Sequence, residues 1–133
     1  MTRIYQGVDL VEITKFEAVF SRNRDFVSEI FTEGEREYCL SMKEPYKHFA
    51  GRFAAKEACM KALGMGLSGI NNLLQEIEVY STPSGKSELS ISGWAEKMGR
   101  KKKIHQLTVS ISHSAQFAVA TVILVGDKGS ESI

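Results

Sequence analysis

Apolar positions in this chain follow two different periods. In the first half they mostly recur every three or four residues, as in helices, and in the second half they mostly alternate, as in strands with one buried face. Thr32 and Glu35 have the spacing of a capping box, and Gly64 follows the longest helical stretch in the position of a C-terminal cap. The predicted helices are 13–20, 23–31, 32–42, 45–63 and 93–103. The predicted strands are 4–11, 75–81, 88–92, 107–112 and 117–125.

Helices that gather early and strands that gather late indicate an α+β fold. We expect a small single domain, with the early helices packed on a mainly antiparallel sheet. The 133 residues suit one domain of this kind. The domain is predicted to cover 1–125, and 126–133 is predicted to be a flexible tail because it has little to bury. A Gly- and Asn-rich loop is predicted over 65–72, and a tight turn over 82–86.

Composition and charge argue against a nucleic-acid-binding protein and against a membrane protein. The chain is 43% apolar and 25% charged, and 17 Lys and Arg against 16 Asp and Glu leave a net charge of +1, which does not predict a nucleic-acid-binding protein. The basic run 100–103 lies at a predicted helix end, where positive charge stabilises the helix dipole. No apolar run approaches the roughly 20 residues of a membrane helix, so no membrane partner is expected. The N-terminus lacks signal-peptide features, and Cys39 and Cys59 lack Cys-x-x-Cys spacing, which together predict reduced thiols in the cytoplasm.

The helix predicted over 45–63 has an unusual distribution of charge. Its bulky side chains form one stripe, its small side chains form the opposite face, and its charged side chains lie within or beside the bulky stripe, which indicates a cleft. A structural alternative is that Glu57 and Lys61 form a surface i,i+4 ion pair, while the stems of Arg52 and Lys56 lie along apolar surface. The bulky stripe is Phe49, Phe53, Met60 and Leu63, and the charged residues are Arg52, Lys56, Glu57 and Lys61.

Two polar residues stand out in the predicted strands. Asp9 lies near the end of the first strand, where an unpaired carboxylate is costly, so a metal ion or a basic partner is expected. The alternative is that Asp9 caps the next helix. His113 lies at the turn between the last two strands, and a lone turn histidine is more often structural than functional.

Three segments, in this order, resemble the motifs of the 4′-phosphopantetheinyl transferase superfamily, in particular its short bacterial holo-[acyl-carrier-protein] synthase type. They are 7–13, 51–62 and 109–113, within a similarity that runs from about Ile4 to Val125, and the Phe-x-x-Lys-Glu-x-x-x-Lys pattern of 53–61 is the most specific. The resemblance implies an enzyme of fatty acid biosynthesis. It would transfer phosphopantetheine from coenzyme A to a serine of apo acyl carrier protein and release adenosine 3′,5′-bisphosphate. It also implies a Mg²⁺ requirement and a homotrimer with sites between subunits.

The resemblance implies specific roles for residues of these motifs. Asp9 and Glu57 would bind the metal, since Mg²⁺ binds one or two carboxylates together with waters and substrate phosphates. Lys61 would contact the reacting phosphate and stabilise the leaving group. Glu57, directly or through a metal-bound water, would be the base for the carrier serine. Alternatively, the metal acidifies its bound water and no protein base is needed.

Substrate contacts follow from the same resemblance. The turn 84–86 is implied to contact the nucleotide, with a plain hairpin turn as the alternative. A basic face beside the first helix would steer an acidic carrier protein, with scattered solvated charges as the alternative. Further alternatives are a non-catalytic coenzyme-A-binding trimeric module and a structural trimeric interaction protein. The implied coenzyme A contacts are Arg52, Lys61, Ser84, Gly85, Lys86, His113 and either Lys43 or Lys47, and the implied carrier contacts are Lys15, Arg22 and Arg24.

Three features depart from the short type. The loop 66–74 is slightly long and 101–106 is rich in lysine, and Ser87 follows Lys86 where relatives often carry proline. These departures concern the geometry of the nucleotide loop and leave the reaction class unchanged.

Overall fold

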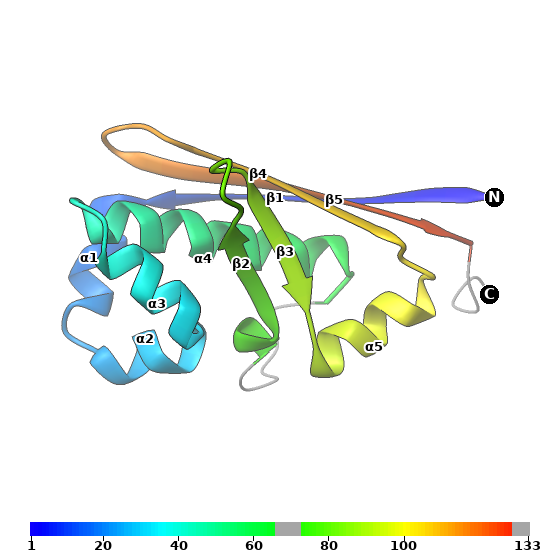
Figure 1. Ribbon diagram of the computed structural model, residues 1–133, viewed down its shortest axis with the longest axis horizontal. Coiled ribbons are helices and arrows are strands. Elements are labelled where there is room, and N and C mark those ends of the chain that lie inside the picture. Colours follow the sequence, from blue (N-terminus) through cyan, green and yellow to red (C-terminus); the bar gives the residue numbers. More distant parts are fainter. Residues whose placement is uncertain (66–72, 129–133) are drawn as a thin grey trace.

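A computed structural model describes residues 1–65 and 73–128 of the chain. Its helices and strands follow the predicted order, shown in Figure 1. The strands are β1 (Thr2–Glu12), β2 (Ile77–Ser81), β3 (Ser87–Ile91), β4 (Gln106–His113) and β5 (Phe117–Asp127). The helices are α1 (Ile13–Phe20), α2 (Arg24–Ile30), α3 (Glu33–Leu40), α4 (Pro45–Ala62) and α5 (Gly93–Lys101), with a 3-10 turn η1 (Leu73–Glu76) before β2. Most of the predicted loop 65–72 lies outside the described residues.

The strands form two antiparallel sheets. The larger has the order β1-β5-β4, so the first strand of the chain pairs with the last, and the smaller is the β2–β3 hairpin. Asp9 of β1 lies opposite Ala120 of β5, and His113 of β4 lies opposite Ala118 of the same strand. The α+β prediction is therefore confirmed, and the sheet places the two conspicuous polar residues on its two outer strands.

The helices cover only one face of the larger sheet. Figure 1 shows α4 running along the sheet with the other helices on the same side, and with the β2–β3 hairpin crossing α4. Alternate residues of β5 point toward α4 and are buried, including Ala118, Val122 and Leu124. On the other face, side chains of β1 are exposed: Ile4 at 66%, Val8 at 52% and Leu10 at 62%. The sheet thus has one buried face, and a second face, apolar mainly along β1, that no other element of the described chain covers.

Several element ends differ from the prediction. The strand predicted from Gln75 begins at Ile77, because η1 takes up the preceding residues, and the last helix ends at Lys101. The predicted flexible tail is wrong at its start: Gly126 and Asp127 belong to β5, where they pair with Arg3 and Thr2. The rest of that prediction, over 129–133, lies outside the described residues. The capping box of Thr32 and Glu35 is confirmed.

No helix in the described ranges 1–65 and 73–128 is long and apolar enough to cross a membrane.

Candidate active site

Asp9 lies on the face of β1 that points toward α4 and has a basic partner there. The Lys61 ammonium donates hydrogen bonds to Asp9 Oδ1 and to the Val8 carbonyl oxygen, both at 3.0 Å. The N-cap of α1 is Glu12 and not Asp9, so the capping alternative for Asp9 is wrong. The expectation of a basic partner is confirmed. Lys61 pairs with a strand residue 52 positions away and not with its helix neighbour.

Glu57 is the second carboxylate of this group, one helical turn before Lys61. Burial raises the pKa of Glu57, the Asp9 carboxylate raises it further, and the Lys61 ammonium lowers it. Glu57 precedes Lys61 by four residues on α4, and Lys61 is bonded to Asp9, so the three side chains lie in the same region. The structure therefore places Asp9, Glu57 and Lys61 near one another where α4 meets β1.

Gly7 allows this approach. A Cβ atom on Gly7 would lie 2.9 Å from the Ala58 carbonyl carbon and 3.0 Å from the Ala62 nitrogen, and it would overlap the Ala58 carbonyl oxygen. These are backbone atoms of α4, which cannot rotate away as a side chain can. The absence of a side chain at this position therefore lets α4 press against β1, and Asp9 reaches the helix two residues later.

Arg52 occupies a different face of α4, which packs against α3 and β2. Its side chain is buried, at 3% exposed. Its guanidinium stacks 3.8 Å from the centre of the Tyr38 ring and donates a hydrogen bond of 3.0 Å to Ser81 Oγ. Arg52 Nε and His113 Nε2 are the buried side-chain nitrogens without a hydrogen-bond partner among the described residues. The proposal that Arg52 is a snorkelling surface side chain is therefore wrong.

His113 lies beside this arginine. Its ring is 5.5 Å from that of His48, and a Cβ on Gly51 would be only 2.5 Å from His113 Nε2, so α4 and β4 are in close contact here. Burial lowers the pKa of His113, and His48, Lys47 and Arg52 lower it further. Burial also lowers the pKa of His48, again with help from Arg52 and Lys47. A concentration of cationic groups that suppress one another's charge favours an anion.

Of the remaining predicted coenzyme A contacts, Lys47 lies in the first turn of α4 and the others lie in exposed turns. Lys43 is exposed in the turn before α4. Gly85 has a positive φ of 89°, which glycine tolerates best, and the space around its Cβ position is open to 4 Å. Lys86 is exposed, and its Nζ lies 3.9 Å from Glu88 Oε1. The turn 82–86 begins directly after Ser81. The hydrogen bond from Arg52 to Ser81 therefore fixes the end of β2 from which the turn starts.

The predicted carrier face is exposed and carries charged residues of both signs beside apolar side chains. Lys15 is exposed, and its Nζ lies 3.7 Å from Glu12 Oε2. Arg22 and Arg24 line a hollow of about 470 Å³ at the α1–α2 turn, together with Phe26 and two acidic residues, Asp25 and Glu29. Two apolar side chains are exposed in this region, Val19 at 50% and Phe26 at 47%.

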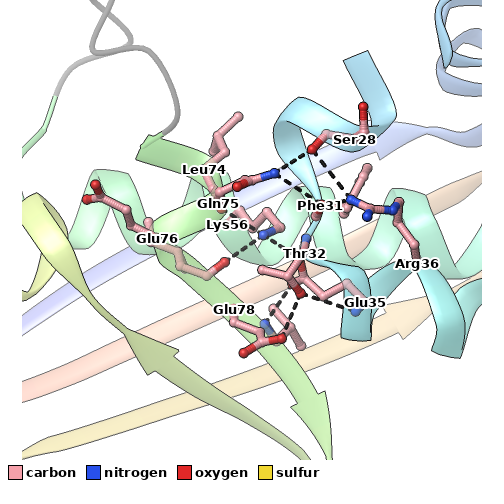
Figure 2. A network of polar contacts seen from close by, with 12 residues as sticks. Ser28, Phe31, Thr32, Glu35, Arg36, Lys56, Leu74, Gln75, Glu76 and Glu78 are labelled. Carbon is pink, nitrogen blue, oxygen red and sulfur yellow. Dashed lines mark hydrogen bonds and ion pairs between the residues drawn. The ribbon is translucent and has the colours of Figure 1, made fainter. Parts of the chain in front are cut away.

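Lys56 and Glu35 form a buried ion pair that the sequence did not predict. The Lys56 ammonium lies 2.7 Å from Glu35 Oε1, and both side chains are fully buried (Figure 2). The sequence pattern placed Lys56 either in a cleft or on the surface, and both placements are wrong. The residues that the sequence analysis missed, Glu35, Tyr38 and Ser81, belong to α3 and β2. Only the capping-box position of Glu35 gave any signal.

The candidate residues therefore form two groups. Asp9, Glu57 and Lys61 lie where α4 meets β1, whereas Arg52 and His113 lie where α4 meets β2 and β4. Since β5 lies between β1 and β4 and neighbouring strands are about 4.8 Å apart, the two groups are separated by roughly 10 Å of sheet.

Comparisons with known proteins identify the class to which this fold and site belong. The family model of the 4′-phosphopantetheinyl transferase superfamily matches residues 6–122, and the chain belongs to this family. It is 35% identical to the holo-[acyl-carrier-protein] synthase of Caldanaerobacter subterraneus over 127 residues, which cover 96% of this chain and 98% of the relative. It is 42% identical to the synthase of the same name from Syntrophotalea carbinolica over 123 residues, which cover 91% and 94%.

Solved structures agree with this assignment. The ACPS–CoA complex of Chronobacterium ammoniagenes superposes with a TM-score of 0.82 at 30% identity, covering 94% of this chain and 98% of that one. The holo-(acyl-carrier-protein) synthase of Bacillus anthracis in complex with CoA (3′,5′-ADP) superposes with a TM-score of 0.76 at 33% identity, covering 96% and 100%. The family predicted from the three sequence motifs is confirmed.

Proposed function

We propose that this chain transfers the 4′-phosphopantetheine group of coenzyme A to a serine of apo acyl carrier protein and releases adenosine 3′,5′-bisphosphate. The reaction would serve fatty acid biosynthesis in the cytoplasm, where the two unpaired cysteines would stay reduced. The observation that carries the proposal is the convergence of Asp9, Glu57 and Lys61 in a member of this family. The coenzyme A complexes of two relatives support the substrate.

Asp9 and Glu57 fit a magnesium ion. Mg²⁺ is usually held by one or two carboxylates and takes its remaining ligands from water and substrate phosphates. The parts of the chain that the structure describes hold no group of three or more His, Cys, Asp or Glu side chains suited to a metal, so water and substrate would supply the other ligands. When bound, the ion would supply charge neutralisation at the diphosphate of coenzyme A.

The protein's own side chains would align and neutralise the reacting groups, which is most of what phosphoryl transfer requires. The Lys61 ammonium, 3.0 Å from Asp9, would reach the reacting phosphate and stabilise charge on the leaving oxygen. Glu57, whose pKa is raised by burial and by Asp9, would accept the proton of the carrier serine.

Arg52 and His113 would bind a phosphate of coenzyme A at the second group. Both carry a buried nitrogen that lacks a partner among the described residues, and an anion would satisfy both. Ser84, Gly85 and Lys86 would contact the nucleotide from the adjoining turn. The ammonium group of Lys43 or Lys47 would place a positive charge beside the 3′-phosphate.

The carrier protein would bind at the α1–α2 surface. Lys15, Arg22 and Arg24 would attract its acidic residues, and the exposed Val19 and Phe26 would supply apolar contact. A rim of charged side chains around an apolar centre is typical of a transient protein interface.

We further propose a homotrimer in which two chains complete each site. The uncovered face of the larger sheet is apolar along β1, where Ile4, Val8 and Leu10 are at least half exposed, and exposed apolar side chains grouped in this way indicate an interface. Within one chain, β5 separates the two groups of candidate residues. A neighbouring chain that brings its Arg52 group to the Asp9 group would unite them.

A mass assay tests the function. Apo acyl carrier protein incubated with this protein, coenzyme A and Mg²⁺ should gain about 340 Da, the phosphopantetheine group moved by metal-assisted transfer, and a chelator should abolish the gain. Calorimetry separates the alternative of a non-catalytic module, which would bind coenzyme A without modifying the carrier. The proposal fails if no carrier is modified while a known synthase modifies the same sample.

A further inference from the structure

We propose that the buried Lys56–Glu35 pair is a positioning device that sets the β2–β3 hairpin, and with it the coenzyme A turn, against α4. The proposal rests on the proposed function for its choice of substrate. Neither residue would touch coenzyme A. Both would act through the strand to which they are bonded.

All hydrogen-bonding groups of Lys56 are used. Its ammonium has three protons and three partners: Glu35 Oε1 at 2.7 Å, the Leu74 carbonyl oxygen at 2.7 Å and the Ile77 carbonyl oxygen at 2.6 Å. A fully buried ammonium is tolerated only with such complete pairing. Lys56 therefore ties α4 to η1 and to the first residue of β2.

Glu35 makes the second connection. Its Oε1 accepts from the Thr32 N–H at 2.9 Å as well as from Lys56, and its Oε2 accepts from the Val79 N–H at 2.7 Å. Thr32 in turn donates to Glu78 Oε2 at 2.6 Å. Figure 2 shows Lys56 and Glu35 at the centre of this network, between α3, α4 and β2.

Every second residue of β2 thus forms a hydrogen bond with a charged side chain. Lys56 holds Ile77, Glu35 holds Val79, and Arg52 holds Ser81, after which the turn 82–86 begins. A two-stranded hairpin is marginal on its own, so its position depends on what holds it. The Lys56–Glu35 pair supplies two of these three attachments, and Lys56 directly precedes Glu57 in the chain.

Removal of the charge on Glu35 tests the proposal. Glu35→Gln preserves the size of the side chain but leaves Lys56 without a counterion, and Lys56→Met removes the ammonium. We expect either variant to raise the KM and Kd for coenzyme A about tenfold, the scale of losing an outer-shell partner, and to change kcat at saturating coenzyme A less than threefold. Because both residues act through the same strand, the double variant should resemble the single variants.

A core variant and calorimetry separate positioning from lost stability. Leu124→Ala removes buried apolar contacts of β5 without removing any of the polar contacts that hold β2, and it should lower Tm while leaving the KM for coenzyme A unchanged. The proposal is overturned if Glu35→Gln lowers Tm as Leu124→Ala does and leaves coenzyme A affinity at the wild-type value. If Lys56→Met does not fold, Glu35→Gln alone decides. A wild-type protein that binds coenzyme A without transfer would refute the proposed function, and calorimetric affinities would still test the positioning.

Discussion

Replacing Gly7 with alanine should disable the candidate site from a position that touches no substrate. The new Cβ would lie 2.9 Å from the Ala58 carbonyl carbon and 3.0 Å from the Ala62 nitrogen. Since carbon atoms pack best at about 3.5–4.0 Å, β1 and α4 would have to separate by roughly 1 Å. Asp9 would move with β1, and Lys61 with α4.

The variant should lower both the Tm and the turnover rate, and the turnover rate should fall much further than the loss of stability explains. Overpacking of a tight contact costs about 1–3 kcal/mol, so Tm should fall by several degrees while the protein stays folded. A displacement of about 1 Å at reacting groups can cost about 10²-fold in rate, so turnover should fall far more than the loss of folded protein explains.

Mass spectrometry of the modified carrier measures turnover, and thermal unfolding of the same samples measures Tm. Gly99→Ala is the matched control, because the nearest atom to its new Cβ is the end of the Ile91 side chain at 3.1 Å, which can move. That variant should keep wild-type turnover. If folded Gly7→Ala protein turns over at the wild-type rate, the close approach of β1 and α4 is not what assembles the site.

Other predictions concern the charged groups and the uncovered sheet face. Glu57→Gln and Lys61→Ala should each lower turnover at least ~10²-fold in the carrier assay, and unchanged rates would remove them from the mechanism. Burial and Asp9 raise the pKa of Glu57, so its carboxylate is lost earlier than usual on acidification. Activity should therefore fall as pH drops through that raised value, and a profile unchanged in Glu57→Gln would contradict this assignment. The pKa of His113, lowered by burial and nearby cations, should rise when adenosine 3′,5′-bisphosphate binds, because an anion favours the imidazolium; an NMR titration that shows no shift would refute the contact. Leu10→Asp should convert the proposed trimer to monomers in light scattering, and a trimer that persists would exclude the sheet face as the interface.

Local patterns predicted most of the helices and strands. The capping box at Thr32 and Glu35 located the start of α3, because both of its hydrogen bonds join residues three apart. The second half of the chain alternates clearly because β4 and β5 each have one face toward α4. The tail prediction failed at Gly126 for a non-local reason. Its pairing partner, Arg3, lies at the other end of the chain.

The candidate site was predictable only where a motif carried it. Asp9 was conspicuous because a carboxylate in an apolar strand needs a partner, and that partner is Lys61. Glu35 could not be identified in the same way. Its local signal, the capping box, already explained it, whereas its bonds to Lys56 and Val79 join residues 21 and 44 positions away.

The charge pattern of α4 also has a simple physical explanation. Successive helical residues are rotated by about 100°, so the step from Lys56 to Glu57 turns from one face of the helix to another, while residues four apart return to nearly the same face. Arg52 and Lys56 consequently share the face that holds β2, and Glu57 and Lys61 share the face beside β1. The charges disturb the apolar stripe because each of these faces meets another strand, although the Lys61 side chain stays half exposed. Each face therefore has its own pair of charged residues, of which the first pair holds the hairpin and the second pair meets Asp9.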